Sequence, residues 1–260
     1  MTLAKDQIGK RSPRQSDRER LERRLARPMG HAIDEWKLIE NGDRILVGVS
    51  GGKDSYTLLQ LLRRFQKRAP IDFELMALHL DQGHPGFDSS RIAAYLEEQE
   101  VEYHIVCKDT YTLVKERIED GEQTCSLCSR YRRGILYNQA EEHGCNKIAL
   151  GHHREDSIET LLLNMFYSGR LAAMPARLQT DDGRFEVIRP MIYVAEEDIR
   201  AYADVMQYPI EPCRLCTDTE RDYVATLLDQ LSAHNSSIRG NLLKAMHKVV
   251  PSHLLDQRLS

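Results

Sequence analysis

A short apolar run followed by a glycine turn constrains this chain more than any other feature. The stretch Arg44-Ile-Leu-Val-Gly-Val-Ser-Gly-Gly-Lys-Asp-Ser55 begins with the branched apolar residues typical of a strand covered on both faces. Leucines at helical spacing follow from Tyr56 to Phe65. Gly51 and Gly52 permit a sharp turn and a close approach of the backbone to a ligand. Because a helix N-terminus presents free N–H groups and partial positive charge, this strand, turn and helix predict a phosphate site.

The side chains of the turn strengthen this prediction, since Ser50, Lys53 and Ser55 add hydroxyl donors and a cation. The spacing excludes a Walker A loop: counted from Gly48, Lys53 takes the place of the second glycine, and Asp54 follows where Ser or Thr is required. It also excludes the GxGxxG pattern of dinucleotide-binding folds. The turn instead resembles the PP-loop of ATP pyrophosphatases, which cut ATP between its α and β phosphates and transfer AMP to a substrate oxygen. An ordinary Gly-Gly turn entering a helix is the alternative.

Length and composition fit one large α/β domain with small appendages. The 260 residues contain no apolar run near the roughly 20 residues that span a membrane, and the first residues lack the apolar segment of a secretory signal. We therefore expect a soluble, cytoplasmic protein. We expect three parts: a basic arm and docking helix at 1–40, an ATP-binding catalytic domain with the first cysteine pair at 41–210, and a helical region with the second pair at 211–260.

The net charge of −4 conceals a basic N-terminal tail. Residues 1–30 hold nine Lys and Arg against four Asp and Glu, which leaves −9 on the other 230 residues. The tail is either a solvated arm that becomes a helix, or an arm that screens the phosphates of a nucleic acid. Ile33, Trp36 and Ile39 recur at three-residue steps, so we expect a helix that docks just before the first strand.

Two further strand ends carry polar residues that belong to the same predicted site. His79 and Asp81 end an apolar run, and ligands of open parallel sheets lie beyond the carboxyl ends of the strands, so they are placed to touch a ribose or an adenine. Gly151, His152 and Asp156 follow another apolar run and are expected to face the glycine turn across a cleft. Asp156 could hold Mg²⁺ or assist proton transfer. An ordinary strand end and an ordinary helix N-terminus are the alternatives.

Four of the six cysteines fall into two CxxC pairs, Cys125 with Cys128 and Cys213 with Cys216. Eighty-four residues separate the pairs, so a shared site would have to be closed by the overall fold. Disulfides are rare in the cytoplasm, which favours a metal or redox centre over inert thiols. Three arginines follow the first pair and form either an exposed helix face or a set of RNA phosphate ligands: Arg130, Arg132 and Arg133.

Several motifs taken together resemble the tRNA-cytidine 2-sulfurtransferases over nearly the whole chain. They are Ser50-Gly-Gly-Lys-Asp-Ser55, the segment from Cys125 to Tyr137, Gly151-His-His-Arg-Glu-Asp156, Asn164-Met-Phe-Tyr167, Ile188-Arg-Pro190 and Pro212-Cys-Arg-Leu-Cys216. The resemblance implies a doubly wound, mostly parallel sheet of the PP-loop type, with a basic N-terminal helical arm and a small helical C-terminal region. It implies 2-thiolation of a cytidine at position 32 in the tRNA anticodon loop, with ATP and Mg²⁺. It also implies a [4Fe-4S] cluster on Cys125, Cys128 and Cys216, a cysteine desulfurase as sulfur source, and a homodimer.

The resemblance assigns roles to individual residues. Adenylation would turn the C2 oxygen into a leaving group, with Lys53, Asp54, Asp156 and Arg132 as catalytic residues. Nucleotide-binding residues are Ser50, Gly51, Gly52, Lys53, Asp54, Ser55, His79, Asp81, Gly151 and His152. The chain departs from the family at Glu155, where an aspartate is common, and at 217–223. Four alternatives stay open: a PP-loop uridine thiolase, another adenylating base-modifying enzyme, an iron–sulfur RNA sensor without turnover, and zinc in place of iron.

Overall fold

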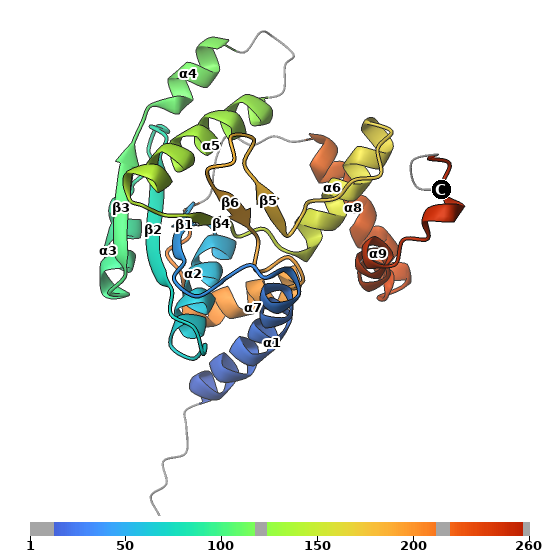
Figure 1. The fold of residues 1–260 in the computed structure, drawn as a ribbon, viewed down its shortest axis with the longest axis horizontal. Coiled ribbons are helices and arrows are strands. Elements are labelled where there is room, and N and C mark those ends of the chain that lie inside the picture. The colour runs from blue at the N-terminus through green and yellow to red at the C-terminus, as the bar shows by residue number, and fades with distance from the viewer. Residues whose placement is uncertain (1–12, 118–123, 212–218, 257–260) are drawn as a thin grey trace, which may run out of the picture.

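The computed structural model describes residues 13–117, 124–211 and 219–256 (Figure 1). Its first half contains α1 (Pro13–Trp36), β1 (Arg44–Gly48), α2 (Lys53–Gln66), β2 (Glu74–Asp81), α3 (Ser90–Glu98), β3 (Glu102–Cys107), α4 (Thr110–Arg117) and α5 (Thr124–Glu142). The second half contains β4 (Lys147–Ala149), α6 (Arg154–Tyr167), β5 (Arg177–Gln179), β6 (Glu186–Ile188), α7 (Glu196–Met206), α8 (Thr219–His234), α9 (Ile238–His247) and the 3₁₀ turn Pro251–His253.

The strands form one sheet in the order β3-β2-β1-β4-β6-β5, in which β5 alone runs antiparallel to its neighbour. Val47 of β1 pairs with Ala77 of β2 on one side and with Ala149 of β4 on the other. The chain therefore moves outward from β1 through β2 to β3, and then returns to add β4 on the opposite side. Open parallel sheets bind ligands at such a switch point, which here lies at the carboxyl ends of β1 and β4.

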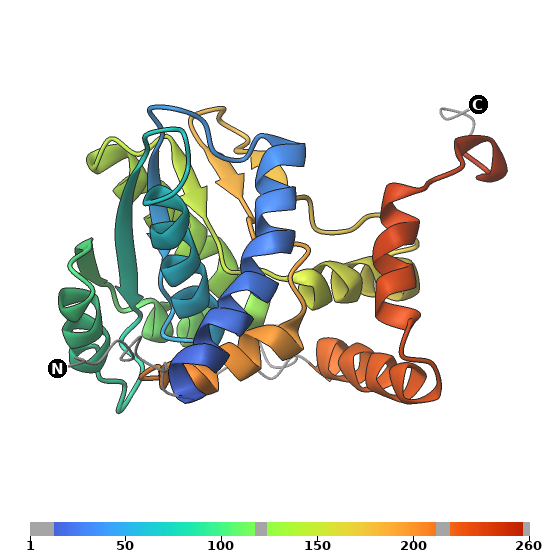
Figure 2. The same cartoon turned by 90° about the horizontal axis from the view of Figure 1, so that it is seen from below.

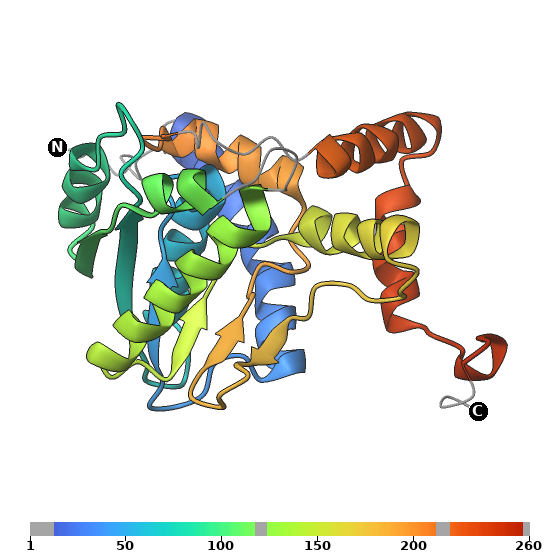
Figure 3. The same ribbon diagram turned by 90° about the horizontal axis from the view of Figure 1, so that it is seen from above.

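Both faces of the sheet are covered, which explains the continuous apolar run of β1. Ile45 and Val47 point to the larger core, formed with α1, α2, α3 and α7, whereas Leu46 points to a smaller core under α5. Figures 2 and 3 show these two helical layers from opposite sides. The expected doubly wound, mostly parallel fold is confirmed. The sequence did not indicate the short strand β5, which runs antiparallel to β6.

The N-terminal helix docks just before β1, as predicted, and packs against α7 and α2. Of the three residues that indicated it, Ile33 packs against the core and Ile39 is buried. Leu21, Leu25 and Met29 of α1 are buried against α2 and α7. Trp36, which we expected to dock, is 44% exposed, and its Nε1 donates to the hydroxyl of Tyr193 at 2.6 Å. The apolar stripe that decides the packing therefore lies earlier in the helix, within the segment that reads as a basic arm.

The last helices form a small group beside the sheet. Ile158 and Leu162 of α6 pack against Val224 and Leu228 of α8, with α9 completing this cluster. Figure 1 shows α6, α8 and α9 together, away from β3. Within the described ranges, no helix is both long enough and apolar enough to cross a membrane.

Candidate active site

The turn after β1 is closed by hydrogen bonds between its own residues. The N–H of Ser50 donates to Oγ of Ser55 at 3.1 Å, and this hydroxyl donates to the carbonyl of Gly52 at 2.9 Å. Gly51 has φ +85°, and a Cβ there would lie 3.0 Å from Ile92. Helix α2 begins immediately afterwards, at Lys53. The turn therefore presents the N-terminus of α2 at the carboxyl end of β1, where an anion is favoured.

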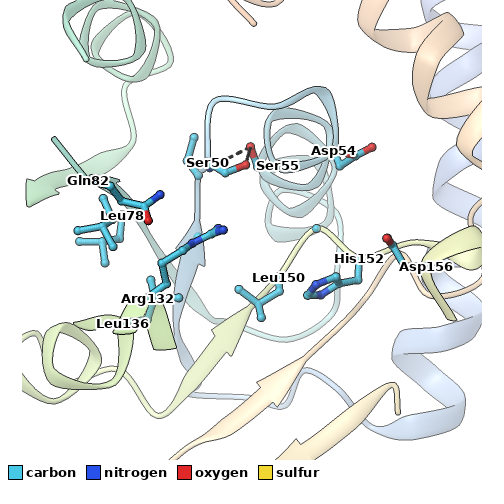
Figure 4. A pocket seen from close by; sticks show the side chains of 14 residues that line it. Ser50, Asp54, Ser55, Leu78, Gln82, Arg132, Leu136, Leu150, His152 and Asp156 are labelled. Carbon is cyan, nitrogen blue, oxygen red and sulfur yellow. Dashed lines mark hydrogen bonds between the residues drawn. The ribbon is translucent and has the colours of Figure 1, made fainter. Parts of the chain in front are cut away.

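A cavity of about 250 Å³ lies at this switch point (Figure 4). Its walls come from the turn after β1, the end of β2, helix α5 and the turn before α6. It is lined by Gly48, Val49, Ser50, Asp54, Ser55, Leu78, Leu80, Gln82, Arg132, Leu136, Leu150, Gly151, His152 and Asp156. Figure 4 shows the Arg132 side chain reaching from α5 into the space between these walls. The structure thus brings seven predicted site residues to one cavity: Ser50, Asp54, Ser55, Arg132, Gly151, His152 and Asp156.

The second turn, between β4 and α6, touches the first one directly. A Cβ on Gly151 would lie 3.1 Å from the backbone carbonyl carbon of Asp54 and 3.1 Å from the backbone nitrogen of Ser55. Such contacts are tighter than most real Cβ contacts, so the backbone of the first turn would have to shift by a few tenths of an ångström. The glycine therefore allows the two turns to meet this closely and form one site.

His153 connects the acidic groups of the two turns. Its Nε2 lies 3.7 Å from Oδ1 of Asp54 and 3.6 Å from Oδ2 of Asp156, and its Nδ1 lies 3.3 Å from Glu155. Burial opposes the charged imidazolium, but these three carboxylates outweigh it and raise the pKa of His153. Burial also raises the pKa of Asp54, against the attraction of His153 and Lys53. His153 was not a predicted site residue, although the motif that contains it, Gly-His-His-Arg-Glu-Asp, was recognised in the sequence.

Glu155 is a buried part of this arrangement. Burial opposes its ionisation, but contacts with His153 and Arg154 outweigh that effect and lower its pKa to about 2. Its Oε2 accepts a hydrogen bond from the N–H of Glu196 at 2.9 Å, at the start of α7. Glu155 thus joins the second turn to α7 as an ionised carboxylate.

Lys53 does not line the cavity. Its Nζ lies 3.1 Å from Oδ2 of Asp54 and 3.0 Å from Oε1 of Glu196. Burial opposes the ammonium charge, but these two carboxylates outweigh it and raise the pKa of Lys53. The lysine is therefore charged and held at the edge of the site. Glu196 was missed by sequence reasoning, because only the fold brings α7 beside the turn.

His152 lies in the cavity wall as a neutral imidazole. Burial, opposed by Asp156, lowers its pKa to about 4, and the nearby charge of Arg189 lowers it further. Its Nδ1 is buried, and no described residue forms a hydrogen bond with it. A neutral ring can donate or accept one hydrogen bond at this position.

His79 and Asp81 lie outside the cavity lining and have structural partners. The His79 ring is buried, and its Nδ1 lies 2.8 Å from the carbonyl of Val49. Asp81 accepts hydrogen bonds from the N–H of Gly83 at 2.9 Å and from Oγ of Ser89 at 2.5 Å. The structure therefore places both residues where they stabilise the end of β2, and not where they line the space for a ligand. Gly51 and Gly52 likewise shape the turn without lining the cavity.

Helix α5 brings one cysteine to the same region. Cys128 lies one turn before Arg132, so the two side chains share a face of the helix. The Cys128 side chain is partly buried, and its Sγ donates to Oε1 of Gln82 at 3.2 Å. Gln82 lines the cavity and was missed, although it directly follows the strand-end residue Asp81. Cys125 lies one turn earlier in α5, but its side chain, Cys213 and Cys216 fall outside the described residues.

These residues fit the cofactors that the resemblance implies. Oδ1 of Asp54 is buried without a hydrogen-bond partner. Two carboxylates completed by phosphate oxygens and water form a usual ligand set for Mg²⁺, and no closed metal site of three or more side chains forms in the described ranges. The thiol of Cys128 beside the cavity suits one corner of an iron–sulfur cluster.

The sheet and the two touching turns define a nucleotide-binding α/β protein of the PP-loop class. Residues 18–228 match the family model for the PP-loop domain. A U34-tRNA thiolase from Methanococcus maripaludis, solved with its [4Fe-4S] cluster, has the same fold: the TM-score is 0.68 at 21% identity, covering 94% of this chain and 83% of that one.

Curated relatives of similar sequence identify the family within the PP-loop class. The chain is 53% identical to the tRNA-cytidine(32) 2-sulfurtransferase of Anaeromyxobacter dehalogenans, over 92% of this chain and 84% of the relative. It is 49% identical to the enzyme of that name from Pseudomonas fluorescens, over 94% of this chain and 90% of the relative. The protein therefore belongs to the tRNA-cytidine(32) 2-sulfurtransferase family of PP-loop proteins.

Proposed function

We propose that this protein uses ATP to replace the C2 oxygen of cytidine 32 in tRNA by sulfur, giving 2-thiocytidine, AMP and diphosphate. The observation that carries the proposal is the single cavity at the switch point, which joins the glycine turn after β1 to the face of α5 that bears Cys128 and Arg132. An adenylation site and a sulfur-bearing side chain are thus neighbours. The names and high identity of the relatives support the same reaction.

The chemistry divides into two balanced steps. In the first, the C2 oxygen attacks the α phosphorus of ATP and diphosphate leaves. In the second, a sulfide sulfur attacks C2, the C2–O bond breaks, and AMP leaves with the oxygen. The N–H groups of the turn and the N-terminus of α2 are placed to bind the phosphates, and Arg132 to stabilise negative charge that develops in the cavity. Lys53 would have to leave Glu196 to reach the diphosphate.

We infer that Asp54 and Asp156 hold Mg²⁺ on the nucleotide phosphates. An iron–sulfur cluster on Cys125, Cys128 and Cys216 would supply an iron position for the incoming sulfur. Cys213 is the alternative to Cys216 as the third ligand. Because the target nucleotide lies in an anticodon loop, its base can be unstacked and inserted into a cavity.

The sulfur source, the oligomeric state, the cellular location and the division into domains are further parts of this proposal. We propose a cysteine desulfurase as sulfur source, a homodimer, and action in the cytoplasm, where tRNA is modified. We also propose the division into a basic arm and docking helix at 1–40, a catalytic domain at 41–210 and a helical region at 211–260.

The cofactor assignment can be tested without turnover. Cys128→Ser, prepared anaerobically, should lose iron and acid-labile sulfide and retain ATP binding, because the cysteine does not belong to the glycine turn. Cys145→Ser is a matched control, since Cys145 is buried in the core under α5. A Cys128→Ser protein with full iron and sulfide content would overturn the assignment, and zinc without sulfide in the wild type would replace it with another metal.

A further inference from the structure

Arg189 is a buried cation that the proposed reaction does not use. It directly follows β6 and is 8% exposed. Its Nη1 donates to the carbonyl of Pro175 at 2.7 Å, whereas its Nε is buried and has no partner among the residues that the structure describes. Within the described ranges, no carboxylate lies close enough to form an ion pair with it.

A buried guanidinium without an ion-pair partner would be stabilised by a bound anion. Burial lowers the pKa of Arg189, yet arginine keeps its proton in proteins, so the charge must be compensated. Tyr137 and Asp156 support this charge through their fields, and the exposed Arg133 opposes it. Within the described ranges, Arg189 therefore has unused hydrogen-bonding capacity at Nε and no ion-pair partner.

A second polar group without a partner lies nearby. The charge of Arg189 acts on His152, whose Nδ1 is also buried and unpartnered. His152 and Leu150 line the cavity. Because Ile188 of β6 pairs with Ala149 of β4, Arg189 follows β6 at the same edge of the sheet, beside Leu150. An oxyanion bound here could accept hydrogen bonds from both.

The position of Arg189 favours RNA over the nucleotide as the source of this anion. Strand β6 is separated from β1 by β4, so Arg189 follows a strand that is not adjacent to the turn proposed to bind the ATP phosphates. Helix α5 lies over this part of the sheet (Figure 3) and carries the exposed Arg130 and Arg133. The field of Arg133 reaches Arg189, so the basic groups of α5 and Arg189 together favour a nucleic-acid backbone at this edge of the sheet.

We propose that Arg189 binds a backbone phosphate of the RNA next to the target cytidine and thereby fixes that nucleotide in the cavity. The inference rests on the proposed function, since it requires an RNA substrate. A guanidinium suits this task because its donors match two phosphate oxygens. Arg189 is then a binding residue for the nucleotide to be modified, and its role is separable from ATP binding.

The test is equilibrium binding of a synthetic anticodon stem-loop RNA to the full-length protein without ATP. Arg189→Gln should lower RNA affinity by about 10-fold or more, as expected for loss of a charge-assisted hydrogen bond. The slope of log affinity against log salt should fall by about 0.7–0.9, the contribution of one phosphate contact. ATP affinity should be unchanged. Arg184→Gln is the matched control, because Arg184 is a surface arginine already paired with Asp182 and Glu141.

Single methylphosphonate substitutions identify the phosphate. With wild-type protein, neutralising one phosphate adjacent to the target cytidine should weaken binding, and the same substitution should cost nothing further in Arg189→Gln. If circular dichroism shows that Arg189→Gln is unfolded, RNA binding by Arg189→Lys and by the wild type with the methylphosphonate RNAs tests the inference instead. Unchanged RNA affinity in a folded variant, no sensitive phosphate beside the target, or loss of ATP affinity alone would overturn the inference. Failure of the wild type to bind RNA would instead overturn the proposed function.

Discussion

Nε2 of His153 and Oδ1 of Asp54 lie 3.7 Å apart, although they belong to two turns separated by almost 100 residues of chain. The same nitrogen lies 3.6 Å from Asp156. A single imidazole thus stands between the carboxylate of Asp54 in the first turn of α2 and the carboxylate of Asp156 in the first turn of α6. The two acidic residues proposed to bind Mg²⁺ are therefore held at one place before any ligand arrives.

This arrangement predicts a pH dependence of stability. The folded-state pKa of His153 is raised, so its contribution is fully present below the ordinary histidine value of about 6.5 and is lost as the pH rises through the folded pKa. In the metal-free protein, the free energy of unfolding of the wild type should therefore fall above pH 6.5 relative to that of His153→Gln. Urea unfolding at several pH values measures this difference. His234→Gln, at an exposed site, is the matched control variant; parallel curves for His153→Gln and wild type would contradict the prediction.

Gly151→Ala should separate the two turns. The added Cβ would lie 3.1 Å from backbone atoms that cannot rotate away, and such overpacking costs about 1–3 kcal/mol. We expect weaker ATP binding, measured by calorimetry. Gly134→Ala is the control: nothing lies within 4 Å of its Cβ position in α5, and the change should stabilise the helix by about 0.4–1 kcal/mol. Unchanged ATP affinity in Gly151→Ala would show that the contact between the turns is dispensable.

The fold was largely predictable because its signals are local. The apolar run of β1, the glycine turn and the leucine spacing of α2 lie next to one another in the sequence, and each indicates the same unit. Strand β5 gave no such signal, since its three residues are exposed and pair only with β6. The buried stripe of α1 formed by Leu21, Leu25 and Met29 was not predicted, because these residues lie among many arginines.

The candidate site was predictable only where its residues follow a strand. Asp54, His152 and Asp156 stand in turns whose position is fixed by the parallel sheet. Glu196 was not predictable, because its contact with Lys53 depends on how α7 packs. His79 carries the right chemistry at a strand end, yet its ring is bonded to the backbone of Val49 rather than lining the cavity.

Glu196→Gln should strengthen ATP binding. Lys53 is held by Glu196 at 3.0 Å, away from the cavity lining, and removing that charge favours movement of the lysine to the phosphates. A partly exposed ion pair is worth up to about 1 kcal/mol, so we expect an effect of up to about fivefold. Glu197→Gln, at an exposed position of the same helix, is the control. The effect should vanish in a Lys53→Ala background; weaker ATP binding in Glu196→Gln would contradict this role.

The most direct test of the proposed reaction is product analysis by mass spectrometry. Anaerobically reconstituted protein would be incubated with unmodified tRNA, ATP, Mg²⁺ and sulfide. The tRNA would then be digested to nucleosides, which are separated and identified by their masses. The account predicts 2-thiocytidine at position 32, formed only when ATP is present and lost in Cys128→Ser. A thiolated uridine, or no thionucleoside from a protein that carries its cluster and binds both ATP and tRNA, would contradict it.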